Sequence, residues 1–128
     1  MTEEQLRAWL DRYEEAFEGQ DPDAAAALFT ADATYQWGPF GDLLRGPAEI
    51  RAKWAQSIDP RDEDVRCDLE ILAVTEDIGF ARWIASFTYP EDRKVVRFDG
   101  VFAVSLSSDG CCREFREWWN SREEPLEP

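Results

Sequence analysis

Apolar and polar residues alternate with helical spacing near the start of the chain. The segment Thr2-Glu3-Glu4-Gln5 has the pattern of a capping box, in which the Thr2 and Gln5 side chains each satisfy a free backbone N–H group. Apolar residues then recur every three or four positions, the period of one helix face; they are Leu6, Trp9, Leu10, Tyr13, Ala16 and Phe17. This pattern predicts a first helix that stops at Gly19.

Two further helices are predicted from proline positions and apolar spacing. Asp21-Pro22 places a side-chain cap and a proline at the start of a short second helix that runs to Phe29. Gly46-Pro47 opens a third helix with a narrow apolar stripe, which consists of Ile50, Trp54 and Ile58. Between these helices, Ala33–Trp37 predicts a short strand and Phe40–Arg45 predicts a loop.

The apolar period changes to two after residue 60. Four long strands are predicted, at Val65–Thr75, Phe80–Tyr89, Lys94–Leu106 and Cys111–Ser121. The segments between them are of hairpin length, which favours an antiparallel meander. The acidic segment Glu123–Pro128 contains two prolines, so we expect a flexible tail there. Helices followed by a meander predict one α+β domain over residues 1–128, with the helices packed on one face of a curved sheet.

The charge of the chain argues against several classes of partner. Among its 128 residues, 14 are Lys or Arg and 28 are Asp or Glu, which gives a formal net charge of −14. Such a polyanion repels phosphate backbones and anionic lipid headgroups, so we expect neither a nucleic-acid nor a membrane partner. The first residues are acidic where a signal peptide needs basic ones, and no apolar run approaches about 18 residues. We therefore expect a cytoplasmic protein.

The absence of histidine restricts the chemistry further. It removes every Ser-His-Asp and Cys-His arrangement. The cysteines Cys67, Cys111 and Cys112 lack Cys-x-x-Cys spacing, so neither a zinc site nor a disulfide framework is predicted. No Gly-rich phosphate loop accompanies the aromatic residues, and we expect no cofactor and no metal. Acid–base chemistry would have to use Asp, Glu, Tyr, Cys or Lys.

The order helix, helix, strand, helix and long meander resembles the nuclear-transport-factor-2-like superfamily, and within it the SnoaL-like proteins of bacteria. The resemblance spans nearly the whole chain and is carried by Asp21–Phe29, Asp32–Tyr35, Leu44–Gly46 with Ile50, Ala81–Trp83 with Ser86–Thr88, Asp99–Phe102 and Cys112–Trp119. It implies a cone-shaped domain in which three N-terminal helices pack on a strongly curved antiparallel sheet around an apolar pocket. Because the fold hosts isomerases, dehydratases, epoxide hydrolases, cyclases and binding modules, the resemblance alone names no activity.

The resemblance also implies which side chains point into the pocket. Strand by strand, they are Trp83, Ala85 and Phe87, then Phe98, Gly100 and Phe102, then Phe115, Glu117 and Trp119. Tyr13, Tyr35 and Trp37 are expected to close the pocket from the other side. The expected ligand contacts are Trp37, Trp54, Trp83, Ala85, Phe87, Phe98, Phe102, Phe115 and Trp119.

The chain departs from the steroid isomerases that this resemblance brings in. Their oxyanion-hole tyrosine matches Tyr13, whereas their base position reads Trp37 and their protonated-acid position reads Gly100. Asp99 is one residue away from that acid position and is expected to point outward, because neighbouring strand residues face opposite ways. Steroid isomerisation by that mechanism is therefore not predicted.

The chain also departs from the limonene-epoxide-hydrolase type. The tyrosine of that site matches Tyr35 and one carboxylate matches Glu117, but the remaining positions read Ala81, Trp83 and Trp37. No Arg–Asp partner is then left to polarise an epoxide. The dehydratases related to scytalone dehydratase use His, which this chain lacks.

Glu117 is the candidate acid–base group. Facing inward, it would lie between Phe115 and Trp119, where burial raises the pKa of a carboxyl. Tyr13 and Tyr35 are candidate hydroxyl donors to a carbonyl or a developing oxyanion. Since Trp118 and Trp119 occupy opposite strand faces, alternation alone does not say which face is inside.

Two hypotheses about function remain open. In the first, the pocket takes a small, mostly apolar metabolite and performs cofactor-free chemistry of the isomerase, lyase or hydrolase type. In the second, the protein is a non-catalytic ligand-binding or dimerising module, and Glu117 serves the fold or orients a ligand.

The outer face of the sheet is expected to pair with a second copy of the chain. It would present Arg82, Ile84, Ser86, Thr88, Arg97, Asp99, Val101, Arg116 and Trp118. An apolar centre of Ile84, Val101 and Trp118 inside an Arg–Asp rim is typical of an interface, so a homodimer is predicted.

Overall fold

Side-chain caps fix where the first two helices begin. The computed structural model describes residues 1–127. In it, helix α1 spans Glu3–Glu18, and Thr2 is its N-cap. Thr2 Oγ1 accepts a hydrogen bond from the Gln5 N–H at 3.1 Å, and Gln5 Oε1 accepts from the Thr2 N–H at 2.9 Å. The Asp21 carboxylate caps α2 (Pro22–Ala26) by accepting from the Ala24 N–H at 3.1 Å. Both predicted caps are confirmed.

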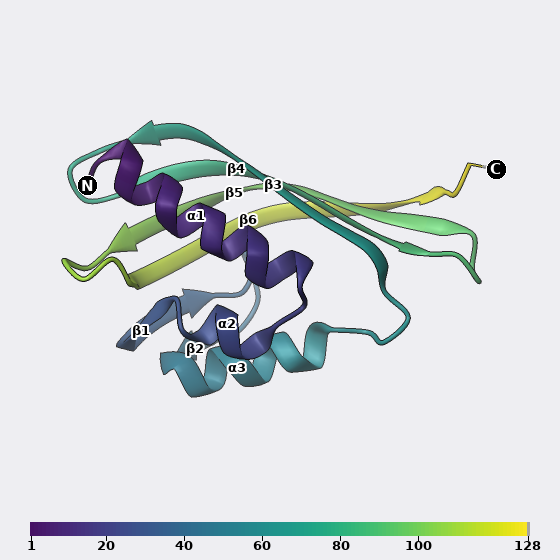
Figure 1. Cartoon of the computed structure of the whole chain (residues 1–128), viewed down its shortest axis with the longest axis horizontal. Helices are drawn as coiled ribbons and strands as arrows, with labels where there is room; N and C mark the ends of the chain where they lie inside the picture. The colour runs from purple at the N-terminus through teal and green to yellow at the C-terminus, as the bar shows by residue number, and fades with distance from the viewer. Residues whose placement is uncertain (128) are drawn as a thin grey trace.

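The strands form one six-stranded sheet in the order β2-β1-β6-β5-β4-β3. Their bounds, with those of the third helix, are β1 (Phe29–Gln36), β2 (Leu43–Arg45), α3 (Gly46–Ser57), β3 (Glu63–Val74), β4 (Gly79–Tyr89), β5 (Lys94–Leu106) and β6 (Cys112–Pro125). Figure 1 shows α1 lying across the long, bent strands, with α2, α3, β1 and β2 grouped on one side of it. The predicted α+β architecture, helices packed on a curved sheet, is confirmed.

The sheet is mixed and not antiparallel throughout. Strands β3 to β6 form the predicted antiparallel meander, but β1 pairs in parallel with β6. Parallel pairing needs a long connection, and the chain between β1 and β6 contains α3 and three strands. The expectation of a purely antiparallel sheet is corrected accordingly.

Two boundaries in the first half of the chain differ from the prediction. The second helix ends at Ala26, and Phe29 already belongs to β1. The reason is long-range: the Cys112 N–H donates to Leu28 O at 2.8 Å, which ties this segment to β6. The predicted loop Phe40–Arg45 contains strand β2, whose residues 43–45 pair with residues 34–36 of β1.

Part of the segment predicted as a tail continues the last strand. Residues Glu123–Pro125 continue β6 and pair with Lys94–Val96 of β5. Two ion pairs accompany this pairing, Lys94 with Glu123 at 3.1 Å and Arg97 with Glu124 at 2.7 Å. Pro128 lies outside the described residues.

Helix α1 covers the exposed backbone edge of β3. The Leu69 N–H donates to Glu14 Oε1 at 2.9 Å, and the Cys67 N–H donates to Glu18 Oε2 at 3.0 Å. Arg7 Nη1 completes the contact by donating to Leu69 O at 2.8 Å. These bonds satisfy edge groups that would otherwise be free to pair with another chain, and they hold α1 across the sheet.

Alternation along the strands separates an inner face from an outer face. On β4, Trp83 and Ala85 are buried while Arg82 and Ile84 are exposed, as the period of two predicts. None of the helices within residues 1–127 is long and apolar enough to cross a membrane.

Candidate functional site

A cavity of about 220 Å³ lies between the helices and the inner face of the sheet. Six of the ligand contacts predicted from the sequence line it, namely Trp37, Trp54, Trp83, Phe87, Phe98 and Trp119. The three candidate catalytic residues, Tyr13, Tyr35 and Glu117, line it as well. The structure therefore brings side chains from α1, α3 and four strands to one place.

Three of the predicted ligand contacts do not line this cavity. Phe102 and Phe115 are fully buried and pack on each other with ring centroids 4.7 Å apart. Ala85 is also buried and does not reach the cavity. At Gly100, a Cβ atom would lie 2.1 Å from Trp118 O, so only glycine allows β5 and β6 to approach so closely there. Phe102 and Phe115 belong to the packed core, whereas Gly100 pairs with Trp83 and Trp119, whose side chains line the cavity.

Six lining residues were not predicted: Phe17, Gln20, Ser57, Ile58, Asp62 and Val65. Phe17 and Ile58 belong to apolar helix stripes recognised in the sequence, so that signal could have placed them. Gln20, Ser57 and Asp62 lie at helix ends or in a connection, where no periodic pattern indicates a direction.

Glu117 is buried on the inner face of β6. Its side chain is only 4% exposed, whereas the neighbouring Trp118 is 44% exposed on the outer face. Tyr35 Oη donates to Glu117 Oε1 at 2.8 Å, and Trp119 Nε1 donates to Glu117 Oε2. Both carboxylate oxygens are thus held by side chains that also line the cavity.

Burial raises the pKa of Glu117 from its ordinary value to about 7. Desolvation is the dominant cause, because the charged form loses the stabilisation that water would give it. The hydrogen bonds from Tyr35 and Trp119 oppose the rise, since both favour the ionised carboxylate. The result is a carboxyl that changes its protonation state near neutral pH.

The two tyrosines remain protonated at that pH. Burial raises the pKa of Tyr13 and of Tyr35 well above the ordinary value, and the nearby charge of Glu117 adds to both shifts. The Tyr35 hydroxyl is engaged with Glu117 and holds that carboxyl in place. The Tyr13 ring is held edge-on by Trp54 and Phe102, at centroid distances of 5.5 and 5.2 Å.

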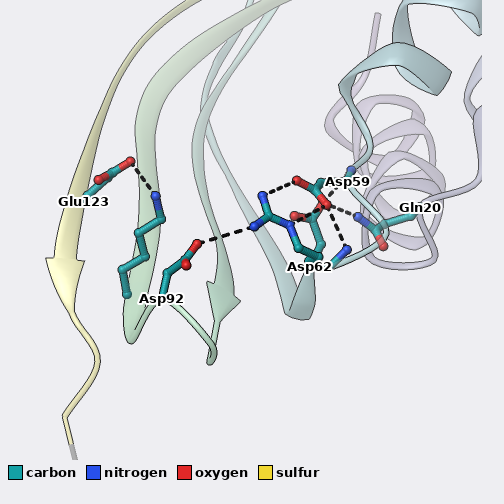
Figure 2. A network of polar contacts seen from close by, with 7 residues as sticks. Gln20, Asp59, Asp62, Asp92 and Glu123 are labelled. Carbon is teal, nitrogen blue, oxygen red and sulfur yellow. Dashed lines mark hydrogen bonds and ion pairs between the residues drawn. The ribbon is translucent and has the colours of Figure 1, made fainter.

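A polar network includes two residues that line the cavity, Gln20 and Asp62 (Figure 2). Asp62 Oδ2 accepts from Gln20 Nε2 at 2.7 Å and from the Asp59 N–H at 3.2 Å. Asp62 Oδ1 is buried, and within residues 1–127 it has no hydrogen-bond partner. Arg61 is directed to Asp59 and Asp92, at 2.9 and 3.6 Å, and forms no ion pair with Asp62 among the described residues. The Asp62 carboxylate is therefore a negative group beside the cavity, with one oxygen buried and unpaired within residues 1–127.

Two buried indole groups of the cavity wall are also unpaired. Within the described part of the chain, Trp54 Nε1 and Trp83 Nε1 have no hydrogen-bond partner, and neither nitrogen is open to the cavity. Both indoles therefore offer carbon surface to an occupant. No three Cys, Asp or Glu side chains within residues 1–127 converge in a way that would hold a metal ion.

The chain is similar to proteins with several activities. A steroid Δ-isomerase of Nocardioides simplex is 26% identical over 115 residues, which cover 90% of this chain and 89% of that protein. The solved structure of SalBIII, an epoxide hydrolase/cyclase-like enzyme with a role in pyran ring formation in the polyether salinomycin, has a TM-score of 0.76 at 21% identity. That match covers 94% of this chain and 95% of SalBIII.

A further structural neighbour is a hypothetical protein of Catenulispora acidiphila with a ketosteroid isomerase-like fold, solved in complex with trimethylamine. Its TM-score is 0.70 at 19% identity, over 92% of this chain and 86% of that one. These solved structures share the fold with this chain. Residues 10–115, which make up most of the chain, match the SnoaL-like domain. The protein therefore belongs to the SnoaL-like domain family.

Proposed function

We propose that the cavity binds a small, mostly apolar metabolite and that Glu117 performs acid–base chemistry on it without a cofactor. The reaction type would be that of an isomerase, a lyase or a hydrolase. The observation that carries the proposal is the position of Glu117, a buried carboxyl whose pKa is raised to about 7 at the wall of an aromatic cavity of about 220 Å³. A group with a pKa near the working pH is suited both to accept and to return a proton.

The contacts of Glu117 support a division of roles. Tyr35 and Trp119 hold the two carboxylate oxygens and so fix the direction from which a substrate proton would be taken. Tyr13 lines the same cavity with its hydroxyl protonated and is suited to donate to a substrate oxygen as charge develops there. In this scheme the proton passes from the substrate to Glu117 and then back to the substrate or on to a leaving group.

The relatives favour this general type and not one substrate. They include a steroid Δ-isomerase and an epoxide hydrolase/cyclase-like enzyme, which are named for an isomerase and for a hydrolase or cyclase reaction. The steroid mechanism itself is not proposed, because Trp37 stands at the base position and stacks on Tyr35 at a centroid distance of 5.5 Å. Of the residues that line the cavity in the described chain, only Glu117 and Asp62 carry a carboxyl.

One observation favours the non-catalytic alternative. Both oxygens of Glu117 already accept a hydrogen bond, so the carboxyl is also well placed to orient a ligand or to stabilise the fold. The two candidates differ in what Glu117→Gln does. In an enzyme, the variant loses turnover; in a binding module, it changes affinity or stability and no rate is affected.

Native mass spectrometry of freshly purified protein is the first test. A co-purified apolar compound, identified after denaturation, supports the proposed binding pocket and gives the class of compound to assay. Because the Catenulispora neighbour was solved with trimethylamine, amines are included among the compounds assayed. Turnover is then compared for the unmodified protein, Glu117→Gln and Glu114→Gln. Glu114 is a matched control, since it lies exposed on the same strand and pairs with Arg116 at 3.3 Å. A Glu117→Gln variant with full turnover contradicts the proposed chemistry.

We also propose that the outer sheet face joins two copies of the chain. Trp118 and Ile84 are exposed there, and the Arg82–Asp99 pair at 2.7 Å borders them. Because this face carries both signs of charge, a second copy can meet it without the repulsion expected between two chains of net charge −14.

A further inference from the structure

Most of the side-chain donors that line the cavity are used inside the protein, whereas the Tyr13 hydroxyl remains available to a ligand. Four lining donors are already used inside the protein: Gln20 Nε2 by Asp62, Tyr35 Oη and Trp119 Nε1 by Glu117, and Ser57 Oγ by Trp54 O. The N–H groups of Trp54 and Trp83 are shielded from the cavity. Each carboxylate oxygen of Glu117 accepts one hydrogen bond and keeps a lone pair for an occupant, whereas Asp62 contributes its charge, because its Oδ1 atom is buried.

The rest of the wall is aromatic. Nine of the fifteen lining residues carry an aromatic ring. Several of these rings contact one another and form a continuous surface: Trp83 lies 5.3 Å from Phe98, which lies 5.5 Å from Trp119 and 5.6 Å from Phe87. Aromatic faces carry a negative quadrupole and attract a cation whose centre lies within about 6 Å.

The cavity contains negative groups and no positive one. Within the described chain, no Lys or Arg lines it, although Glu117 and Asp62 do. The nearest cation found on a lining ring is Lys53, whose Nζ lies 5.5 Å from the Trp37 centroid while it pairs with Asp42 at 3.5 Å. That contact uses one ring of the wall, and Lys53 itself is not a lining residue.

We infer that the pocket recognises an apolar amine in its cationic form, a tertiary or quaternary ammonium whose charge meets the aromatic rings and the carboxyl groups of Glu117 and Asp62. This inference rests on the proposed function, because it names the class of molecule that enters the same cavity. A neutral apolar molecule would use the rings but not the negative charge of the two carboxyl groups, whose hydrogen bonds come from neutral donors. An anionic molecule would meet no positive group.

The bound cation also selects the form of Glu117. An ammonium nearby lowers the pKa of the carboxyl, because opposite charge favours ionisation, and so leaves Glu117 as the carboxylate that a general base requires. The titratable groups that face Glu117 are Tyr13 on α1, Tyr35 on β1 and, beyond Tyr13, Cys67 on β3, each with a pKa raised by burial. The other elements present Trp54, Trp83 and Phe98 to the cavity. Glu117 is therefore the group whose charge changes between mildly acidic and mildly basic pH.

Choline and its carbon isostere 3,3-dimethylbutan-1-ol provide a matched pair of probes, since they have the same shape and differ in charge. Binding is followed by tryptophan fluorescence at about 150 mM salt, where exposed charges are largely screened. At about pH 8.5 we expect choline to bind about tenfold more tightly than the isostere. At about pH 5.5 the advantage of choline should fall several-fold, because Glu117 is then neutral.

Variants separate the cavity from the surface charge of the protein. Glu117→Gln should remove the pH response of choline binding, and Asp62→Asn should weaken choline binding at both pH values. Glu114→Gln removes the same charge from the exposed side of the same strand and should change neither. Far-ultraviolet circular dichroism verifies that each variant is folded. If Glu117→Gln does not fold, Asp62→Asn still tests the inference.

Three results would overturn the inference. In the first, the isostere binds as tightly as choline at about pH 8.5. In the second, Glu114→Gln reduces the preference for choline as much as Glu117→Gln does. In the third, neither probe binds. Binding of the isostere alone still supports an apolar pocket, so it separates failure of this inference from failure of the proposed function. Mass spectrometry of the co-purified molecule tests the latter independently.

Discussion

The two ends of the aromatic interior are built from the same kinds of residue but differ in how completely they are filled. At the packed end, Trp9, Phe29, Phe102 and Phe115 are buried against one another, and Trp9 Nε1 donates to Leu28 O at 3.0 Å. At the pocket end, nine aromatic residues line a cavity that also contains a buried carboxyl, Glu117. Complete packing and complete hydrogen bonding indicate a region that serves stability, whereas unfilled space and unpaired polar atoms indicate one that serves binding.

Truncating one phenylalanine at each end tests this difference most strongly. Phe115→Ala should destabilise the protein by about 3–5 kcal/mol, because it leaves a hole in a fully packed core. Phe98→Ala should cost less than half of that, since Phe98 is only partly buried and borders existing space. Urea unfolding measures both, and equal losses would contradict the division into two ends.

The buried carboxyl should make stability fall as the pH rises. Its pKa in the folded protein is raised to about 7 from the ordinary value of 4.5. The contribution of Glu117 to the free energy of unfolding is therefore fully present below the pKa of the unfolded chain, and it is lost as the pH rises through the pKa of the folded protein. The loss attributable to Glu117 is about 3 kcal/mol between acidic and mildly basic pH. Glu117→Gln should lack this slope in urea unfolding, whereas Glu114→Gln should retain it; parallel slopes in all three proteins would place the Glu117 pKa near its ordinary value.

Substituting tryptophan by phenylalanine compares the hydrogen bonding of the two ends. Trp9→Phe removes a bonded N–H group, and Trp54→Phe removes an unpaired one. Both substitutions remove similar volume, so Trp9→Phe should be more destabilising by about 1 kcal/mol, the net contribution of one hydrogen bond. The difference is modest because Leu28 O still accepts from the Cys112 N–H at 2.8 Å. Thermal unfolding measures it, and a larger loss in Trp54→Phe would indicate a partner for that indole.

Local signals in the sequence predicted much of the fold. The capping box at Thr2, the Asp21-Pro22 start and the alternation along β4 each depend on residues close together in the chain, and the structure has all three. Long-range features were not predictable in this way. The parallel pairing of β1 with β6 joins segments far apart in sequence, and the end of α2 is set by a backbone bond to Cys112.

The candidate site shows the same division. Glu117 and Tyr35 were identified as candidates, but their mutual hydrogen bond and the direction of β6 depend on how the sheet packs. A tryptophan on each face of β6 left the alternation balanced, so the expectation that Trp118 lies outside depended on the family resemblance, and its exposure agrees with that expectation. Phe102 and Phe115 follow the inward pattern correctly, yet they fill the closed end of the cone, because alternation gives the face and not the depth.

A substitution on the outer sheet face should cause the smallest change in the free energy of unfolding, but it should change the oligomeric state. Trp118 is 44% exposed and has the Arg116 guanidinium 5.5 Å from its ring, so Trp118→Ser should alter the free energy of unfolding of the monomer by no more than about 0.5 kcal/mol. If two copies meet through Ile84, Val101 and Trp118, the same substitution shifts the protein from dimer to monomer in light scattering over a range of concentrations. Leu72→Ser is the matched control, since Leu72 is 51% exposed on β3, away from that centre. A dimer that survives Trp118→Ser but not Leu72→Ser would move the interface to the β3 edge, which α1 only partly covers.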